Sequence, residues 1–527
     1  MTIKWLSFML LMSALFSAEA HATTYNAATC NESDVSSAIA TATGAGSGNT
    51  VDIPSGTCTW TTQLVTTLSV SLNIIGAGNQ SVTGGGDVTN IVDHVDHNSC
   101  NCSMWAIATG SSSNVVRISG ITIEQDSGSI STDNGIVTIT GSSQSLRWDH
   151  SHFVINASVS GSSLNVDIDG WMYGVFDHNL FDLLNASVNN GVRIGHGTWN
   201  GQSLGNGSWN DTEYFGSNQF MFFEDNTFNG GAANDCNDGG RFVLRHNTFN
   251  DSFTQAHEME NDLRGCRAWE EYSNTFNGTA SDSIDSSDAM QTRMGTGLAW
   301  GNVSTGMHTF LDLNNDRTNT GHSFAAPPNG WGYCGTTYGP SGWDQNSGSS
   351  GYACVDQVGR GKGDLLTGTF PNKCDQTSGA CSTNTYTGTW PNQALVPVYE
   401  WLDEWSPANG YSGGLCTSGD TNTVAQNRDF YCYTLAWNGS SFTGTAFNGT
   451  VGTGSGLLAG RPSTCASGPS GNTSGVAYWA TDQNTLYVCN PTNTWTSYYI
   501  PYTYPHPLVQ GQGQPPGPPS GLQAIVD

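Results

Sequence analysis

Hydrophobic and polar positions alternate in short runs along the first part of the chain. Near the start the spacing is helical instead, with apolar residues at Val35, Ala38 and Ile39 and with Asp34 placed to cap the helix. From Val51 onward, short runs alternate between apolar and polar positions and are separated by Gly, Pro and Ser. This pattern predicts one amphipathic helix followed by many short strands.

A phrase ending in Phe then recurs five times, as LRWDHSHF, GVFDHNLF, MFFEDNTF, FVLRHNTF and WEEYSNTF. Repetition at this spacing indicates a solenoid. Coils of a β-helix stack about 4.8 Å apart, so matched positions align along the axis. We expect an internal stack of Phe153, Phe181, Phe228, Phe249 and Phe276. We expect left-handed turn positions at Asn179, Asn226, Asn247 and Asn274. The alternative, an antiparallel sandwich, would not need such matching.

Two phrases after the expected helix carry a family resemblance. They are a strand-Pro-x-Gly-Thr phrase at Ile53–Thr57 and an Ile-Ile-Gly-x-Gly turn at Ile74–Gly78. With the Phe phrase, they resemble the pectate-lyase-like superfamily over residues 31–305. The resemblance implies an all-β fold: a right-handed parallel β-helix with an N-terminal capping helix. The superfamily includes lyases, hydrolases, esterases and epimerases that act on uronic-acid-containing polymers, but also adhesins and phage tailspikes, so activity does not follow from the fold.

The first residues have the pattern of a secretory signal peptide. Lys4 precedes an apolar run, and Ala18, Ala20 and Ala22 give the Ala-x-Ala spacing of a cleavage site. The run is shorter than the roughly 20 residues that span a bilayer. We therefore expect a secreted, extracellular protein with no membrane span. The formal charge of −28 excludes a nucleic-acid partner, because phosphate binding needs a basic surface.

Composition divides the chain further. We expect the signal peptide over 1–22, the β-helix over 23–310, Cys/Gly-rich decorations packing on the solenoid over 311–410, a small disulfide-stapled β unit over 411–508, and a Pro/Gly-rich tail over 509–527. The decorations include an expected helix, Gln393–Trp405. The β unit includes an expected hairpin around Asp482.

All fourteen cysteines follow the signal peptide, and an even number in an exported chain indicates disulfides. Pairing of sequence neighbours predicts Cys30–Cys58, Cys236–Cys266, Cys334–Cys354, Cys374–Cys381, Cys416–Cys432 and Cys465–Cys489. Cys100 and Cys102 bond to each other or to other cysteines. The stretch from Asp93 to Cys102 has a metal-like set of His, Asp and Cys, but disulfide bonding removes its thiols as ligands.

Charged residues concentrate between Asp235 and Glu271, where twelve of them fall in a chain that is only 11% charged. Neighbouring coils of a solenoid would bring them onto one lateral face. The candidate catalytic residues are Arg241, Arg245, His246, His257, Glu258, Glu260, Arg264 and Arg267. The expected substrate and partner is an extracellular polysaccharide, and the seventeen Trp and eighteen Tyr residues offer faces for sugar stacking.

Two mechanisms fit this cluster. In a polysaccharide lyase, Arg or His would take the C5 proton of a uronate while Arg or Ca²⁺ neutralises its carboxylate. In a glycoside hydrolase, Glu258 would act with a second carboxylate from Glu260, Asp251 or Asp262. A third interpretation has no catalysis: the charges pair with each other on a solvated face, and the protein is a glycan-binding surface protein or adhesin.

Two other motifs allow a ligand or a plain structural role. The phrase VRIGHGTW, with His196, is similar to the Gly-His-Gly of polygalacturonases, but that family's acid and base phrases are absent, so its mechanism is not transferred. A buried, turn-stabilising His196 is expected. Asp282, Asp285 and Asp288 are candidate Ca²⁺ ligands or a polar turn. Ca²⁺ is the one candidate cofactor, and the identity of any metal stays open.

Overall fold

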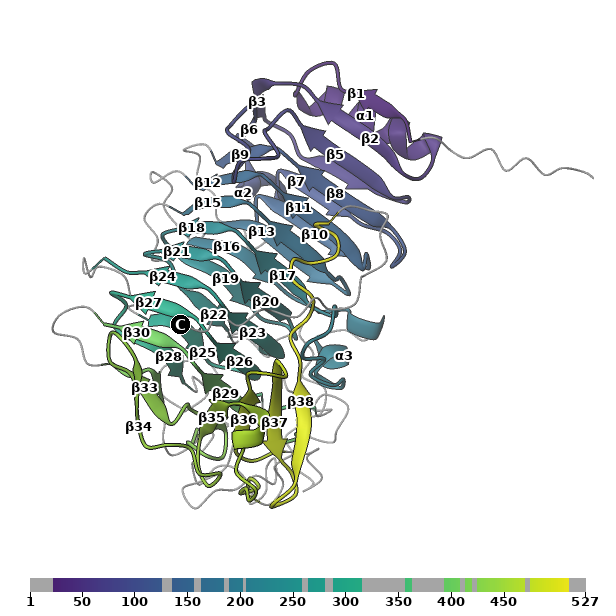
Figure 1. Cartoon of the computed structure of the whole chain (residues 1–527). Helices are drawn as coiled ribbons and strands as arrows, with labels where there is room; N and C mark the ends of the chain where they lie inside the picture. The colour runs from purple at the N-terminus through teal and green to yellow at the C-terminus, as the bar shows by residue number, and fades with distance from the viewer. Residues whose placement is uncertain are drawn as a thin grey trace, which may run out of the picture.

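The computed structural model (Figure 1) describes residues 22–125, 135–155, 163–183, 189–201, 205–257, 264–279, 288–314, 356–362, 393–407, 413–418, 424–469 and 474–510. Within these ranges, three long parallel sheets wind into a right-handed parallel β-helix. No helix in this part of the chain is long and apolar enough to cross a membrane. The expected signal peptide lies outside the described residues.

Each coil contributes one strand to each sheet, which we call sheets A, B and C. Sheet A contains β1 (Thr24–Asn26), β2 (Asn49–Ile53), β5 (Leu72–Gly76), β8 (Val115–Ser119), β11 (Ser145–Asp149), β14 (Gly174–Asp177), β17 (Met221–Glu224), β20 (Arg241–Arg245), β23 (Ala268–Tyr272), β26 (Thr296–Trp300), β29 (Val398–Trp401) and β32 (Phe430–Tyr431). Sheet B contains β3 (Gly56–Trp60), β6 (Thr89–Asp93), β9 (Thr122–Gln125), β12 (His152–Ile155), β15 (Leu180–Leu183), β18 (Thr227–Asn229), β21 (Thr248–Asn250), β24 (Thr275–Asn277), β27 (Val303–Thr305) and β30 (Glu404–Ser406). Sheet C contains β4 (Leu64–Thr67), β7 (Trp105–Ala108), β10 (Val137–Gly141), β13 (Ser163–Gly170), β16 (Asn189–Ile194), β19 (Ala232–Cys236), β22 (Thr254–Ala256), β25 (Asp288–Thr292), β28 (Thr309–Leu313) and β31 (Cys416–Thr417).

The first coil is closed by α1 (Glu32–Ala45), which buries Val35, Ala38, Ile39 and Ala42 against the solenoid. The helix begins one turn earlier than predicted. Asn31 is its N-cap residue, while Asp34 lies in the first turn and accepts a hydrogen bond from the hydroxyl of Thr29. The cap covers apolar side chains that would otherwise be exposed at the end of the stack.

The predicted aromatic stack is present inside sheet B. Phe153, Phe181, Phe228, Phe249 and Phe276 are fully buried. Successive rings lie 4.7, 4.6, 5.2 and 4.6 Å apart between centroids, with nearly parallel planes. The parallel register of sheet B fixes this spacing, since Phe is paired with Phe from one coil to the next.

The asparagines of the repeated phrase do not adopt the predicted left-handed backbone. That conformation belongs to the residue before each of them, as in His178 (φ 56°) and His246 (φ 57°). The Asn side chains instead form a buried ladder, in which the backbone N–H of Asn226 donates to Oδ1 of Asn247 at 3.0 Å and so on from coil to coil. Asp403 ends the ladder by accepting from Asn302 at 2.7 Å. The ladder satisfies backbone N–H groups at a turn buried on all sides.

The solenoid continues past residue 310. Strands β29 and β30 extend sheets A and B, and β31 and β32 add the last pairings. The predicted helix Gln393–Trp405 is therefore wrong. Its apolar residues, Val398, Tyr399 and Trp401, pack as a strand does against the preceding coil, because the sheet edge offers them hydrogen bonds as well as apolar contact.

The last part of the chain forms a separate four-stranded sheet, made of β35 (Thr453–Gly456), β36 (Ala477–Ala480), β37 (Thr485–Cys489) and β38 (Trp495–Tyr499). The predicted hairpin around Asp482 joins β36 to β37. A smaller hairpin consists of β33 (Leu435–Trp437) and β34 (Phe442–Gly444). Trp479 packs against Trp300 and Trp401 of sheet A, with ring centroids 5.2 and 5.4 Å away. The C-terminal sheet thus packs on the outer face of sheet A at its last coils.

Residues 499–510, which we call the C-terminal strap, then run back along the outer face of sheet A (Figure 1). Tyr499 donates to Glu270 at 2.7 Å, and further along Leu508 accepts from Arg147 at 3.2 Å. The strap therefore crosses from the coil of β23 to the coil of β11.

The structure contains the disulfides Cys30–Cys58, Cys236–Cys266, Cys416–Cys432 and Cys465–Cys489, which match the predicted pairs, and also Cys100–Cys102. The predicted pairs Cys334–Cys354 and Cys374–Cys381 lie outside the described residues. The short helices α2 (His97–Cys100) and α3 (Asn206–Trp209) and the 3-10 turns η1 (Trp199–Gly201) and η2 (Leu458–Gly460) lie in connections between strands.

Candidate functional site

Three of the predicted catalytic arginines, Arg241, Arg264 and Arg267, converge beneath the 205–213 loop, and Arg245 lies apart from them. Arg241 and Arg267 are fully buried and hold the connection between β16 and β17 against the solenoid. Arg241 donates to Oγ and O of Ser208 at 2.8 and 2.7 Å, and Arg267 donates to Glu213 at 2.8 Å. Burial lowers the pKa of Arg241 to about 9. Both residues position a loop rather than face solvent.

Arg264, which lies between β22 and β23, also holds a loop in place. Its guanidinium forms a two-point pair with Asp356, with both distances 2.8 Å, and donates to Asn206 at 3.0 Å. The side chain is fully buried. Arg264 therefore ties the loop of α3 to residues far along the sequence.

Arg245 and His246 lie beneath the C-terminal strap. Arg245 pairs with the buried carboxylate of Glu224 at 2.6 Å and donates to the backbone oxygens of Tyr502 and Thr503 at 2.8 and 2.9 Å. His246 stacks on Tyr504, with ring centroids 3.8 Å apart, and burial lowers its pKa to about 4. These two residues hold the strap in place.

Of the remaining candidates, His257 lies on the outer face of sheet C, and Glu258 and Glu260 are outside the described residues. Nε2 of His257 accepts from Arg293 at 2.6 Å, so its proton is on Nδ1, which is 3.7 Å from Asp235. Among the candidates that the structure describes, His257 lies in a partly exposed cluster of charged side chains, together with Asp235 and Arg293.

That cluster follows the register of sheet C. Asp167, Arg193 and Asp235 stand side by side on successive coils. Arg193 makes a two-point pair with Asp167, with both distances 3.0 Å. Burial nevertheless raises the pKa of Asp167. Oδ1 of Asp235 is buried and accepts no hydrogen bond from the described ranges of the chain. The two carboxylates share this face with the guanidinium groups of Arg193 and Arg293.

Two further carboxylates, Asp169 and Asp238, meet at Gly197. A Cβ atom at position 197 would lie 2.5 Å from Oδ2 of Asp238 and 3.0 Å from Oδ1 of Asp169, so only glycine fits between them. The N–H of Gly197 donates to Oδ1 of Asp169 at 3.0 Å. The two carboxyl oxygens are therefore no further apart than the sum of those first two distances.

Asp238 differs from an ordinary surface carboxylate. Burial, together with the charges of Asp169 and Asp167, raises its pKa to about 7. Its Oδ1 atom is buried and has no hydrogen-bond partner among the residues that the structure describes. Asp238 therefore holds a proton at mildly acidic pH beside a second carboxylate, which is the arrangement of a general acid and its partner.

His196 positions this pair. It is fully buried, donates from Nδ1 to the backbone oxygen of Gly170 at 2.9 Å and lies 5.0 Å from the ring of Trp199. Burial lowers its pKa to about 3, so the ring is neutral. The backbone N–H of His196 donates to the backbone oxygen of Asp238 at 3.2 Å. His196 thus has the buried, turn-stabilising role expected from the sequence.

The outer face of sheet A carries a contrasting set of charges. Arg117 pairs with Asp149 at 2.7 Å, Asp149 lies 3.4 Å from Arg147, and Arg147 pairs with Asp177 at 2.8 Å. Despite burial, hydrogen bonds from Arg117 and His150 hold the pKa of Asp149 well below its usual value. Each charge of this ladder is neutralised by the next.

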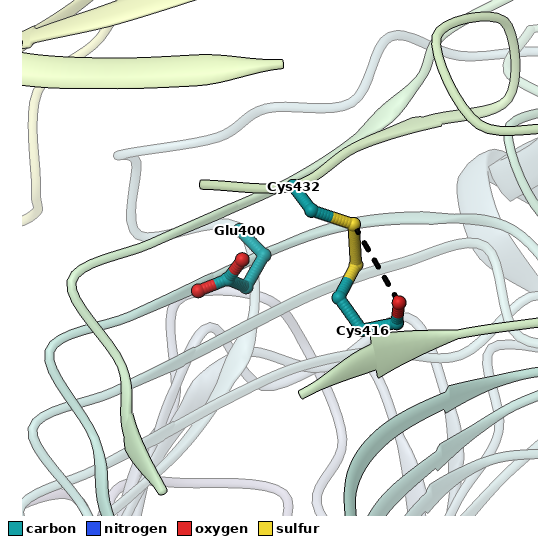
Figure 2. A group of neighbouring side chains, drawn as sticks. All are labelled: Glu400, Cys416 and Cys432. Atoms are coloured by element: carbon teal, nitrogen blue, oxygen red, sulfur yellow. Dashed lines mark hydrogen bonds between the residues drawn. A yellow bond between two sulfur atoms is a disulfide. The ribbon is translucent and has the colours of Figure 1, made fainter. Parts of the chain in front are cut away.

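No metal ligand set among the described residues fits an ion. Figure 2 shows the one gathered group, Glu400, Cys416 and Cys432, in which the two sulfur atoms form a disulfide and so offer no thiolate. In the Asp93–Cys102 stretch, His97 pairs with Asp93 at 2.8 Å, and the two cysteines are bonded to each other. Of the Ca²⁺ candidates, Asp282 and Asp285 lie outside the described residues.

Comparison with known proteins does not add to this geometry. No protein-family model matches the sequence, and the curated proteins give no match.

Asp169 was not among the residues expected from the sequence, and Asp238 was only one member of the charged stretch from Asp235 to Glu271. Asp169 lies in the run Asn165-Val-Asp-Ile-Asp169, whose alternation places both aspartates on the outer face of one strand. That signal was present in the sequence. The meeting of Asp169 with Asp238 was not, because it depends on the path of the 195–201 segment between coils.

Proposed function

We propose that the protein is a secreted, extracellular glycoside hydrolase of the pectate-lyase-like β-helix type that cleaves a polysaccharide at the outer face of sheet C. The observation that carries the proposal is the meeting of Asp238 and Asp169 at Gly197. One is a carboxylic acid with a pKa of about 7, and the other is a carboxylate held by the N–H of Gly197.

In this mechanism Asp238 gives its proton to the glycosidic oxygen as the bond to the anomeric carbon breaks. Asp169 attacks that carbon and forms a covalent glycosyl ester. Asp238, now ionised, then takes a proton from water, and the water oxygen displaces Asp169. Carboxyl groups about 5–5.5 Å apart are typical of this double displacement, whereas inverting enzymes need about 6.5–9.5 Å. The upper limit set at Gly197 favours retention of anomeric configuration.

The test incubates the purified protein with pectic, alginate-like and neutral polysaccharides, with Ca²⁺ and with chelator. Reducing sugar and ultraviolet absorbance of unsaturated ends are followed together. We expect reducing sugar without unsaturated ends, lost in Asp238→Asn and Asp169→Asn but retained in Asp52→Asn, an exposed aspartate on β2. Unsaturated ends would identify a lyase instead. Retention on a polymer without any release would identify a non-catalytic glycan-binding protein or adhesin.

A further inference from the structure

A glycine-rich loop, residues 77–88, leaves the solenoid between β5 and β6 and lies along the corner where sheet A turns into sheet B. The N–H of Gly84 in this loop donates to the backbone oxygen of His178 at 3.0 Å. His178 follows β14, which is three coils further along sheet A than β5. A Cβ atom at Gly85 would lie 2.4 Å from the backbone oxygen of His150, so only glycine allows this close approach. The loop is therefore docked on coils other than its own.

A histidine of the solenoid, His152 on β12, fastens the loop. Its Nδ1 lies 2.7 Å from Oδ1 of Asp87 in the loop, and its Nε2 lies 2.8 Å from Oδ2 of Asp182 on β15. An ionised carboxyl group only accepts hydrogen bonds, and a neutral imidazole has only one N–H. His152 can therefore donate to both carboxylates only as the imidazolium. We call the three side chains the clasp.

The two carboxylates of the clasp account for the proton on His152. Burial lowers the pKa of His152, but the hydrogen bonds with Asp182 and Asp87 outweigh burial and leave the pKa raised above its usual value of 6.5. The same bond with His152 lowers the pKa of Asp182, so this carboxyl group is ionised at neutral pH. The clasp is thus closed in the state with one proton on each ring nitrogen.

Neighbouring charged groups are bonded to other partners. Glu124 of β9, the next strand of sheet B, accepts from the amide of Asn90 at 2.8 Å. Nδ1 of His150 and Nδ1 of His178 each lie within 3.0 Å of the aspartate that precedes the histidine. Asp87 and Asp182 are therefore the charged groups that decide the proton affinity of His152.

Loss of the proton on His152 weakens the clasp without abolishing it. The neutral ring can donate to only one of the two carboxylates, so the other hydrogen bond is lost. Each carboxylate keeps an uncharged donor, which is the hydroxyl of Thr122 for Asp87 and the amide of Asn229 for Asp182. The loop keeps its own backbone contacts but loses a charged link to the solenoid.

We propose that Asp87, His152 and Asp182 form a pH-dependent clasp, which holds the 77–88 loop on the solenoid while His152 is protonated and loosens the loop when the proton leaves. The stabilisation of the docked loop is complete below about 6.5 and falls as the pH rises through the raised pKa of His152. The inference does not use Asp169 or Asp238, so it is independent of the proposed hydrolase activity.

The experiment is hydrogen–deuterium exchange of the full-length protein at several pH values from about 5 to about 9, read by mass spectrometry of peptides that cover the loop. The N–H of Gly84 is the reporter, because its partner is the oxygen of His178. Each rate is divided by that of the same peptide in unfolded protein at the same pH, which removes the intrinsic pH dependence of exchange. We expect protection of the loop to fall about tenfold or more across this range, because a hydrogen bond to a charged group is lost.

Two variants test the clasp directly. His152→Gln is uncharged at every pH and should give the weak protection of the high-pH state throughout. Asp87→Asn should weaken protection at acidic pH and flatten its pH dependence. Asp87 is exposed, so this variant tests the clasp even where His152→Gln fails to fold. His94→Gln, which changes an exposed histidine outside the loop, is the matched control and should behave as the unaltered protein does.

Three results would overturn the inference. One is protection of the loop that does not change with pH in the unaltered protein. Another is full protection at acidic pH in both His152→Gln and Asp87→Asn. The third is an equal loss of protection in peptides from β20 and β23, because the whole solenoid would then open and the loop would have no pH response of its own.

Discussion

The outer faces of sheets A and C are built by the same repeat but arrange their charges differently. On sheet A, each arginine pairs with the aspartate of the next coil, Arg117 with Asp149 and Arg147 with Asp177, and the strap covers the charges that follow. On sheet C, the aspartates Asp167, Asp169, Asp235 and Asp238 gather on one face, and within the described part of the chain Asp235 and Asp238 each keep a buried oxygen without a hydrogen bond. A solenoid can therefore use one face for stability and reserve another for chemistry, because the arginine-paired carboxyl of Asp149 has a lowered pKa and stays ionised, whereas the pKa of Asp238 is raised to about 7.

The largest expected effect tests whether sheet C is the catalytic face. Asp238→Asn should lower turnover by about 10²- to 10⁴-fold, because proton transfer in the transition state contributes that much. Asp169→Asn should lower it at least as much, because an amide oxygen cannot form the glycosyl ester. Asp149→Asn on sheet A should lower stability instead and leave the turnover of folded protein unchanged. Initial rates, normalised to the folded fraction by circular dichroism, measure both. Equal loss of turnover from Asp149→Asn would abolish the distinction between the faces.

The second effect tests the neutralisation of sheet A under the strap. Arg245→Ala should cost about 3–5 kcal/mol of unfolding free energy, because it leaves the buried carboxylate of Glu224 without its partner. Arg193→Ala on sheet C should cost less, since the Arg193 side chain is 21% exposed and its partner Asp167 is 11% exposed. Urea unfolding provides both values. A similar cost for the two variants would show that burial under the strap adds nothing.

The fold was largely predictable, because β-helix coils repeat the same side chain at the same place. The Phe stack and the capping helix follow from that rule. The Asn ladder could not be predicted in this way, because a repeated Asn is equally consistent with a left-handed turn position and with a buried side chain that forms hydrogen bonds. The helix prediction at 393–405 failed because a short, largely apolar run such as Val398–Trp401 does not distinguish a buried strand from a helix. The site was less predictable. Arg241, Arg264 and Arg267 lie in a charged stretch of the sequence, but in the structure they hold loops in place. Only the three-dimensional structure distinguishes these structural charges from the pair Asp169 and Asp238.

The third effect concerns a carboxyl inside the solenoid, on the opposite side of sheet A from the ladder. Burial raises the pKa of Glu271 from 4.5 to about 8. Its folded pKa exceeds the unfolded value, so it adds stability at low pH that is lost as pH rises from about 4.5 to about 8. The slope is at most about 1.4 kcal/mol per pH unit. Glu271→Gln keeps an acceptor for Thr254, which donates at 2.7 Å, and should remove that slope.

This measurement is chemical denaturation at several pH values from 5 to about 8. Asp52→Asn, in which an exposed carboxyl is changed, serves as the control and should leave the slope as it is. An unaltered slope in Glu271→Gln would mean that the carboxyl ionises without cost in the folded protein.

The smallest effect is expected at the exposed end of the sheet A ladder. Arg117 is 28% exposed and pairs with Asp149. Asp149 would keep Ser119 at 2.8 Å, His150 at 2.8 Å and Arg147 at 3.4 Å after Arg117→Gln. We therefore expect a loss of no more than about 1 kcal/mol, far below that of Arg245→Ala, where buried Glu224 loses its ion-pair partner. The same urea unfolding measures this loss. A loss as large as that of Arg245→Ala would show that Ser119, His150 and Arg147 do not compensate for the missing Arg117.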